Sequence, residues 1–436
     1  MTRGLLIAAP ASGSGKTLIT LALLRHFRNG GRAVASVKVG PDYIDPAFHR
    51  AASERPCLNL DSWAMRPATL AAALQRAGEG AEMVLGEGVM GLFDGAGPEG
   101  RGSTAELAAR LGWPVLLVVD AGGMGASAAA LVEGFLGHRP EPQIAGVIFN
   151  RVGSPAHAEL LRQACGHLPL PVLGALRRRS DLVLPSRHLG LVQAAEHADL
   201  EAFLEAAAAA VAEDLDVEAL PALALPARLE PGAGPAPLPP LGQRIAVAQD
   251  EAFAFVYPLI LEGWRATGAE LSFFSPLADE APEAAADAVF LPGGYPELQA
   301  GRLAGNTGFL TGLRAAAARG AAVYGECGGY MVLGHELVDA EGRGHAMAGL
   351  LPIITSFAEP RLSLGYREAE LAADGPLGVD GTVFRGHEFH YAVQGAGPGG
   401  PPLFRGRDAQ SRDLGALGCR KGAVSGSFLH LIDRWN

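Results

Sequence analysis

The sequence predicts an α/β protein with two parallel-sheet domains. Its 436 residues exceed what one ordinary hydrophobic core accommodates. Two long segments, 4–216 and 244–436, alternate short apolar runs with stretches of helical period. Apolar runs without polar alternation are typical of parallel strands that are covered on both faces. We therefore expect domains at residues 1–216 and 244–436, joined by a linker at 217–243.

Composition and charge narrow the class of protein. Hydrophobic residues make up 49% and charged residues 19%, and the 59 glycines suit a compact protein with many tight turns. The formal net charge of -11 leaves no basic face for a phosphate backbone, so we expect no nucleic-acid partner. The apolar runs are too short to cross a membrane. The four cysteines form no C-x-x-C pair, which argues against zinc and disulfides and fits a reducing cytoplasm.

Proline marks the expected linker. Seven prolines lie between Pro221 and Pro240. Because proline lacks a backbone N–H, such a stretch favours a linker over a helix or a central strand. The alternating pattern restarts at Arg244, and it predicts helices over 253–267 and 304–319.

A phosphate-binding loop opens the first domain. The segment from Ala8 to Thr17 follows an apolar strand and begins a helix, so its backbone N–H groups would cradle phosphates. Lys16 would bridge the outer phosphates, and the Thr17 hydroxyl would join the shell of a Mg²⁺ ion. Pro10 replaces the usual first glycine and fixes the entry to the loop. The expected ATP-binding residues are Ser12, Gly13, Ser14, Gly15, Lys16, Thr17 and Asn150.

Polar residues after other expected strands complete this site. Carboxylates at the carboxyl ends of parallel strands lie where open sheets bind ligands, although each could instead cap a helix. Asn150 could read an adenine edge or form a turn. The expected magnesium ligands are Thr17, Asp42 and Glu87. The residues expected near the transferred phosphate or the acceptor are Lys38, Asp45 and Asp94.

One cysteine of the second domain has the setting of a nucleophile. Cys327 lies between an apolar strand and a helix and is followed by two glycines, which permit a strained turn. The helix N-terminus is expected to lower the pKa of the thiol. The N–H groups of Gly328 and of the loop Gly293–Gly294 are expected to stabilise an oxyanion. Cys57, Cys165 and Cys419 are expected to be buried structural residues.

The expected base is a histidine distant in sequence. His430 follows an apolar strand-like stretch near the C-terminus and is the best candidate. The rival segment His387-Glu388-Phe389-His390-Tyr391 suggests a zinc protease, but H-E-x-x-H would need a histidine at 391. That segment is expected to be a strand whose side chains alternate between faces.

Together these motifs resemble the cobyrinate or hydrogenobyrinate a,c-diamide synthase family. The resemblance covers nearly the whole chain through SGSGKT, KVGPDYIDP, EGVMGLFDG, STAEL, PGGYPE, YGECGGYM and GHEFHY. It implies a P-loop synthetase domain similar to dethiobiotin synthetase, followed by a flavodoxin-like class I glutaminase domain. Cys327 and His430 match the family's nucleophile and base. Most class I glutaminases carry a glutamate two residues after the histidine, but Ile432 stands there, so the group that orients His430 stays open.

The resemblance implies a reaction in cobalamin biosynthesis. MgATP and glutamine would amidate the a and c side-chain carboxylates of hydrogenobyrinic acid or cobyrinic acid. A carboxylate is a poor electrophile for ammonia, whereas an acyl phosphate has a good leaving group. Basic residues at 177–179 and 187–188 could grip the polycarboxylate, or form a solvated face. A cytoplasmic location is expected, and a homodimer is left open.

Two alternatives remain at this stage. One is another tetrapyrrole amidase, either a cobyric acid synthase or a nickel-sirohydrochlorin a,c-diamide synthase. The other is a regulatory nucleotide-binding protein that senses glutamine. The combination of Cys327, His430 and the oxyanion glycines counts against the second, because a sensor needs no nucleophile.

Overall fold

The computed structural model of the protein divides the chain into two compact units. The described residues are 2–184, 186–187, 190–197, 199–230, 232, 234–395 and 399–436. The first unit comprises Met1–Trp63 and Leu70–Gly234, and the second comprises Ala64–Thr69 and Pro235–Asn436. A short excursion of the N-terminal sequence is therefore part of the second unit. None of the described helices is long and apolar enough to span a membrane.

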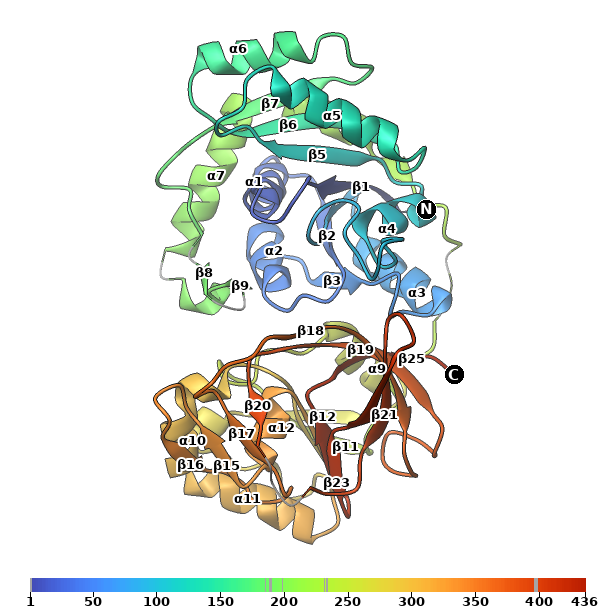
Figure 1. The fold of residues 1–436 in the computed structure, drawn as a ribbon, viewed down its shortest axis with the longest axis vertical. Coiled ribbons are helices and arrows are strands. Elements are labelled where there is room, and N and C mark those ends of the chain that lie inside the picture. Colours follow the sequence, from blue (N-terminus) through green and yellow to red (C-terminus); the bar gives the residue numbers. More distant parts are fainter. Residues whose placement is uncertain are drawn as a thin grey trace. The chain divides into compact units, whose positions relative to one another are not determined.

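The first unit is built on a parallel sheet with the strand order β3-β2-β4-β1-β5-β6-β7 (Figure 1). Its central strands consist almost entirely of buried apolar residues, as a sheet covered on both faces requires. The parallel strands are β1 (Arg3–Ala8), β2 (Val34–Val39), β3 (Cys57–Leu60), β4 (Met83–Glu87), β5 (Val115–Asp120), β6 (Ile144–Val152) and β7 (Val172–Arg177). The two-residue strands β8 (Ser186–Arg187) and β9 (Gly190–Leu191) pair with each other.

Helices connect these parallel strands. Helix α1 lies between α2 and α7, and α5 packs against α6 (Figure 1). Arg25 of α1 donates hydrogen bonds to Glu201 and Glu205 of the Ala-rich α7. The helices are α1 (Lys16–Asn29), α2 (Asp45–Ser53), α3 (Pro67–Gly78), α4 (Thr104–Leu111), α5 (Ser127–His138), α6 (Pro155–Ala164) and α7 (Leu200–Asp214), with 3-10 turns η1 (Ala194–Glu196) and η2 (Val217–Ala219).

The proline-rich stretch carries more structure than its composition predicts. Helix α8 (Leu220–Leu223) has Pro221 in its first turn, where a missing N–H costs no helical hydrogen bond. Strand β10 (Leu225–Pro226) pairs in antiparallel with the start of β1. The contacts divide the chain after Gly234, inside the linker expected at 217–243.

The second unit contains a six-stranded sheet with the order β12-β11-β13-β14-β24-β23. The first five strands are parallel, and taken in chain order they run 2-1-3-4-5, the flavodoxin-like order. This confirms the α/β class and the flavodoxin-like architecture. The strands are β11 (Arg244–Ala248), β12 (Glu270–Phe274), β13 (Ala288–Leu291), β14 (Ala322–Glu326), β23 (Cys419–Lys421) and β24 (Val424–Ser427).

Two helices of this unit differ from their expected bounds. Helix α9 (Pro258–Ala266) begins five residues later than the pattern suggests, because Pro258 disfavours helical geometry in the residue before it. The helix expected over 304–319 is split into α10 (Ala300–Gly305) and α11 (Thr307–Ala318). Asn306 separates them, and its side chain donates to two carbonyl groups of another turn. The remaining helical elements are α12 (Gly328–Leu333), η3 (Pro276–Ala278) and η4 (Pro296–Gln299).

Two further sheets complete the second unit. One is antiparallel, with the order β22-β21-β18-β19-β25, and the segment His387–His390 lies in its strand β19, as expected. Its strands are β18 (Ser363–Leu371), β19 (Val383–His390), β21 (Phe404–Asp408), β22 (Asp413–Leu417) and β25 (His430–Arg434). The other contains β15 (Glu336–Val338), β16 (Gly344–Ala346), β17 (Ile354–Ser356) and β20 (Val393–Gln394).

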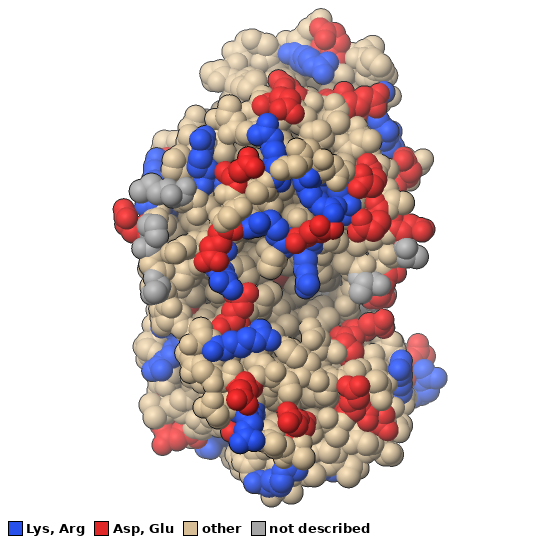
Figure 2. Space-filling view, turned by 180° about the vertical axis from the view of Figure 1, so that it is seen from behind, with Lys and Arg blue, Asp and Glu red and all other residues tan. Residues whose placement is uncertain are grey.

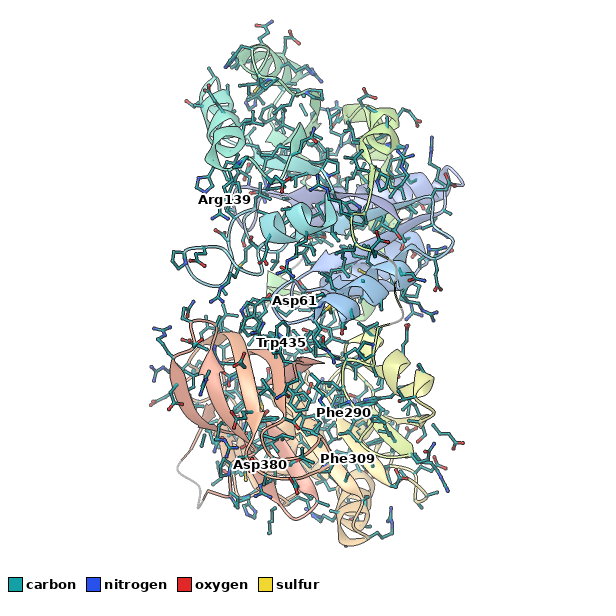
Figure 3. The ribbon with its side chains drawn as sticks, turned by 90° about the vertical axis from the view of Figure 1, so that its right-hand side faces the viewer. Asp61, Arg139, Phe290, Phe309, Asp380 and Trp435 are labelled. Atoms are coloured by element: carbon teal, nitrogen blue, oxygen red, sulfur yellow. The ribbon has the colours of Figure 1, made fainter. Side chains whose placement is uncertain are left out.

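Aromatic side chains fill the core of the second unit. Figure 3 shows Phe290 and Phe309 within it. Phe290 stacks on Tyr324 of the neighbouring strand, with ring centroids 6.0 Å apart, and Phe309 contacts Phe253 edge to face. These contacts fix β14, the strand that leads to Cys327.

Candidate functional site

The residues of the expected phosphate loop lie between β1 and α1. Gly13 and Gly15 have φ angles of 79° and 98°, which glycine adopts without strain. Gly15 precedes α1, and a Cβ there would lie 2.0 Å from the Asn150 amide nitrogen. Ser14 donates to a carbonyl within the loop at 2.9 Å, while Ser12 is exposed. The N-terminus of α1 has no side-chain cap, so its N–H groups face outward, as anion binding requires.

Polar side chains from four elements, α1, β2, α2 and β4, meet behind this loop. The Thr17 hydroxyl donates to Glu87 Oε1 at 2.6 Å. Lys38 donates to the same oxygen at 3.0 Å and to Asp45 Oδ2 at 2.5 Å. The parallel pairing of β2 with β4 sets Lys38 directly beside Glu87. Lys16 lies close by and donates to the carbonyl oxygen of Met90 at 2.5 Å.

Lys38 and Glu87, at the centre of this cluster, both remain charged at neutral pH. Burial alone would lower the pKa of Lys38, but Asp45, Glu87 and Asp42 together raise it well above its usual value. Burial alone would raise the pKa of Glu87, but Lys38 and His49 hold it well below its usual value. The pKa of Asp45 rises to about 7, first through burial and then through the charge of Asp42. At neutral pH, Glu87 is therefore a carboxylate beside an ammonium group.

Sequence reasoning overlooks His49, which is fully buried. Its Nε2 lies 2.7 Å from Glu87 Oε2, and its Nδ1 lies 3.4 Å from Cys57 Sγ. His49 thus holds the Glu87 oxygen that neither Thr17 nor Lys38 contacts. The available signal is its spacing, because a residue four positions after Asp45 lies on the same helix face.

Asp42 and Asp94 lie at the margin of the cluster. Asp42 Oδ1 accepts from two N–H groups at the start of α2, at 2.9 and 3.0 Å, and its Oδ2 is 3.8 Å from Lys38 Nζ. Asp94 Oδ2 accepts from the N–H of Gly91 at 2.9 Å, within its own loop. Asp42 thus orders the chain at the entry to α2, although the N-cap residue itself is Ile44.

The donor set fits a hard cation. Over the described residues, no three His, Cys, Asp or Glu side chains are grouped to hold a metal ion. The oxygen pair of Thr17 and Glu87 is nevertheless in place, and Glu87 is ionised. Mg²⁺ is usually held by one or two protein oxygens and completes its octahedral shell with water and phosphate oxygens.

A cavity of about 740 Å³ opens beside the loop. Its walls include Lys16, Asn150, Arg151 and the stretch 177–184. Asn150 donates to the Ser14 carbonyl oxygen at 2.9 Å, and its own amide oxygen accepts from the N–H of Arg151 at 2.8 Å. The Asn150 amide thus supports the loop backbone from the wall of the cavity.

The expected anion-gripping arginines are largely paired with acidic groups. Arg177 donates to Asp214 at 2.8 Å and also pairs with Glu213, and Arg179 is 2.6 Å from Glu213. The side chains at 187 and 188 lie outside the described residues. On the face shown in Figure 2, acidic and basic side chains are intermixed.

Cys327 lies at a strained turn in the second unit. It follows β14, has φ 47° and ψ -105°, and precedes α12. Its N–H donates to the Ser427 carbonyl oxygen at 2.8 Å. A Cβ on Gly328 would lie 3.0 Å from the Gly294 nitrogen, so the two glycine segments expected at the oxyanion site are close together. A positive φ at a non-glycine residue between a strand and a helix is the backbone geometry of a nucleophile elbow.

The expected pKa of the thiol is wrong in direction. Burial raises the pKa of Cys327 well above its usual value, and the charge of Glu297 adds to this effect. The N–H of Gly328 lowers the pKa of Cys327, but its effect is smaller than that of burial. The thiol is therefore protonated at neutral pH and needs a base to become a nucleophile.

His430 lies beside the loop Gly293–Gly294, the expected oxyanion loop. A Cβ on Gly293 would lie 2.3 Å from His430 Cε1, so the loop backbone contacts the imidazole ring. His387 stacks on the same ring, with centroids 5.0 Å apart and planes 26° apart. Burial lowers the pKa of His430 well below its usual value, and His387 and His390 lower it further. His430 is therefore neutral at pH 7 and able to accept a proton.

Two carboxylates are candidates to orient His430: Glu326, which lies near it in space, and Asp433, which follows it in the sequence. Glu326 Oε2 is 3.9 Å from His430 Nδ1, and sequence reasoning passes over it although it is an acid at the end of an apolar strand. Asp433 accepts instead from Arg66 Nη2 at 2.6 Å and from the Arg66 N–H at 2.7 Å. Arg66 belongs to the excursion 64–69 that is part of the second unit.

Comparisons with known proteins match both halves of the chain. Residues 5–192 match the model of the CobQ/CobB/MinD/ParA nucleotide binding domain, and residues 244–434 match the CobB/CobQ-like glutamine amidotransferase domain. The hydrogenobyrinate a,c-diamide synthase of Brucella suis is 56% identical over 437 residues, which cover 99% of this chain and 98% of that protein. The chain belongs to the hydrogenobyrinate a,c-diamide synthase family. The relative from Rhodobacter capsulatus is 55% identical over 440 residues, with the same coverage.

Membership of the hydrogenobyrinate a,c-diamide synthase family defines the class of enzyme. The chain is a carbon–nitrogen ligase of cobalamin synthesis with a glutamine amidotransferase domain and a nucleotide-binding domain that uses ATP. A solved glutamine amidotransferase from Thermotoga maritima is 15% identical and covers 43% of this chain and 75% of its own, but its TM-score of 0.30 is too low to bear on the fold.

Proposed function

We propose that the enzyme amidates the a and c side-chain carboxylates of hydrogenobyrinic acid, with glutamine as the nitrogen donor and MgATP as the activating agent. The observation that supports this most is the presence of two clusters of expected site residues in one family member. The glycine-rich loop before α1 is backed by Lys38 and Glu87. Cys327 lies at a strained turn close to Gly294, and the neighbouring Gly293 contacts the ring of a neutral His430. The regulatory glutamine sensor considered above explains the second site less well, because sensing needs no nucleophile.

Glutamine hydrolysis is the role we assign to Cys327 and His430. The thiol attacks the side-chain amide carbon of glutamine as its proton passes to His430. The N–H groups of Gly293, Gly294 and Gly328 stabilise the oxyanion of the tetrahedral intermediate. His430 returns the proton to the leaving nitrogen, ammonia departs, and a thioester remains. Water then hydrolyses the thioester, which releases glutamate and restores the thiol.

Carboxylate activation is the role we assign to the phosphate loop. The N–H groups at the start of α1 and the Lys16 ammonium bind the phosphates, and the acceptor carboxylate displaces ADP from the γ-phosphoryl group. Thr17, Glu87 and Asp42 are the proposed Mg²⁺ ligands, and a bound Mg²⁺ would neutralise phosphate charge. Lys38, Asp45 and Asp94 are proposed to lie near the transferred group. Ammonia then attacks the acyl phosphate and releases phosphate.

The assignment is tested by product analysis with two corrin acids. Purified enzyme is incubated with glutamine, MgATP and either hydrogenobyrinic acid or cobyrinic acid, and products are followed by mass spectrometry together with ADP release. We expect a diamide from hydrogenobyrinic acid, two ADP per diamide, and a higher kcat/KM than with cobyrinic acid. A higher kcat/KM for cobyrinic acid would reverse the substrate assignment. Glutamine hydrolysis without ADP release or amide formation from either acid would favour the sensor.

A further inference from the structure

A buried carboxylate precedes the nucleophile. Glu326 is the last residue of β14 and is 3% exposed. Strand pairing sets it opposite Ser427, whose carbonyl oxygen accepts from the N–H of Cys327. Burying a carboxylate is costly, because removal from water disfavours its charged form. Such a costly arrangement is typical of a functional position.

The two oxygens of Glu326 have different surroundings. Oε1 accepts from the Tyr324 hydroxyl and from the N–H of Leu431, both at 3.1 Å. Oε2 lies 3.9 Å from Nδ1 of His430. One oxygen is thus anchored by two donors, one of which comes from the residue after His430. The anchoring aims the other oxygen at the imidazole.

The ring of His430 has two further contacts. The backbone of Gly293 touches the ring at Cε1, and His387 stacks on its face. Ile432, which occupies the place of the usual orienting glutamate, has no polar side-chain atom. Asp433 accepts from Arg66 through both carboxylate oxygens. Glu326 lies within ion-pair distance of His430, with Oε2 3.9 Å from Nδ1.

We propose that Glu326 is the positioning residue of the glutaminase site and takes the role of the missing glutamate. As Cys327 transfers its proton to Nε2 of His430, Nδ1–H donates to Glu326 Oε2, and the carboxylate stabilises the imidazolium. The present distance is about 1 Å longer than a hydrogen bond, and such contacts commonly tighten in the substrate complex. This inference rests on the proposed roles of Cys327 and His430.

The surroundings of Glu326 add a pH dependence. Burial raises the pKa of Glu326 to about 8, and hydrogen bonds from Leu431 and Tyr324 only partly offset it. The titratable groups that face it are Tyr324, Cys327 and His430. Burial raises the pKa values of Tyr324 and Cys327 well above usual, and His430 is neutral at pH 7, so none of them titrates near pH 8. The active carboxylate form therefore increases as the pH rises through 8.

The test is Glu326→Gln, which keeps the shape and the acceptor for Tyr324 and Leu431 but removes the charge. We expect kcat for glutamine hydrolysis to fall about 100-fold, with KM for glutamine within about threefold, because the charge acts on proton transfer. The rise in kcat/KM near pH 8 should disappear. ATP-dependent amidation with free ammonia should be unchanged. The matched control is Glu270→Gln, an exposed residue at the start of β12, which should behave as the native enzyme.

Several outcomes would overturn the proposal. Native glutaminase kcat in Glu326→Gln would show that the carboxylate is not used, and a raised KM with native kcat would place Glu326 in glutamine binding. If this variant does not fold, the pH dependence of the native enzyme tests the proposal instead. A kcat/KM for glutamine hydrolysis that is flat from pH 7 to pH 9 would exclude the role. Failure of the proposed function is recognised separately, since a native enzyme without glutaminase activity, or an active Cys327→Ser protein, would disprove that function itself.

Discussion

At the scale of single residues, three buried carboxylates differ in the direction and extent of their pKa shifts. Glu87 has Lys38 and His49 beside it and stays ionised. Glu326 has a hydroxyl and an N–H as its hydrogen-bond donors, so its pKa rises to about 8. Burial also raises the pKa of Asp433, although Arg66 opposes the shift. The number of cations in direct contact decides how far burial is compensated.

The phosphate-loop cluster leads to the first prediction. Lys16→Ala or Glu87→Gln should lower ATP-dependent amidation at least about 100-fold, because each removes a charge held at the phosphates or the expected cation. Glutamine hydrolysis, which takes place in the other unit, should keep measurable activity. Phosphate and glutamate release are measured in parallel. Glu159→Gln on the exposed face of α6 serves as the control, and full amidation by either site variant would refute the assignment.

Asp433 leads to the second prediction. Asp433→Asn should reduce stability and affect glutamine hydrolysis by no more than about threefold, because the side chain contacts Arg66. The cost should be below the ~3–5 kcal/mol of breaking a fully buried pair, since the Arg66 side chain is 24% exposed. Urea unfolding of Asp433→Asn, Arg66→Ala and the double variant measures the coupling energy. A loss of glutaminase activity as severe as in His430→Ala would instead make Asp433 the orienting group.

At the scale of elements, the same strand–turn–helix arrangement occurs in both units. A parallel strand ends, a glycine-rich turn follows, and a helix begins, at Gly15 before α1 and at Gly328 in the first turn of α12. The turns differ in what contacts them. A Cβ at 15 would meet Asn150, whereas a Cβ at 328 would meet Pro296 and the Gly294 nitrogen. Both glycines therefore allow a close approach, to a side chain at 15 and to a loop backbone at 328.

The oxyanion loop leads to the third prediction. Gly293→Ala should lower kcat for glutamine hydrolysis by about 10-fold to 100-fold, because its Cβ would lie 2.3 Å from His430 Cε1 and must displace the ring. Amidation with ammonia should be retained. Gly305→Ala is the matched control, since a Cβ there meets no atom within 4 Å. Native glutaminase kinetics in Gly293→Ala would show that His430 is not confined by this loop.

At the scale of the whole molecule, the residues proposed for the two chemistries belong to separate compact units. Glutamine chemistry is assigned to the second unit and acyl-phosphate chemistry to the first. Ammonia is the only reactant that both share, and in bulk water at neutral pH it becomes ammonium, which is no nucleophile. The two activities should therefore be separable by supplying ammonia directly.

Cys327→Ser provides the fourth prediction. The hydroxyl keeps the shape of the thiol but has a far higher pKa and is a poorer nucleophile, so thioester formation should essentially stop. Free ammonia needs no thioester and should restore diamide formation when supplied at high concentration and alkaline pH. Product mass is measured with MgATP, the corrin acid and either nitrogen source. A variant that still uses glutamine, or a folded one that fails with ammonia, would contradict this division of labour.

The sequence by itself determined the order of elements and the reactive residues that adjoin them. Uninterrupted apolar runs are possible only for strands covered on both faces, so the α/β class followed from the pattern and was confirmed. The glycine turn before Lys16 indicated its site because φ preferences are local. The glycines after Cys327 allow close packing instead, since a Cβ on Gly329 would lie 2.0 Å from the Leu291 carbonyl oxygen. Pro258 could also have located the start of α9, since its effect on the preceding residue is local too.

Only the tertiary structure decided which side chains meet and in what charge state. His49 reaches Glu87 across elements, Arg66 reaches Asp433 over a separation of 367 residues, and Glu326 faces His430 from another strand. The prediction of a low pKa for Cys327 was wrong for the same reason. A pKa depends on burial and on neighbouring charges in space, and neither is encoded in the spacing of residues along the chain.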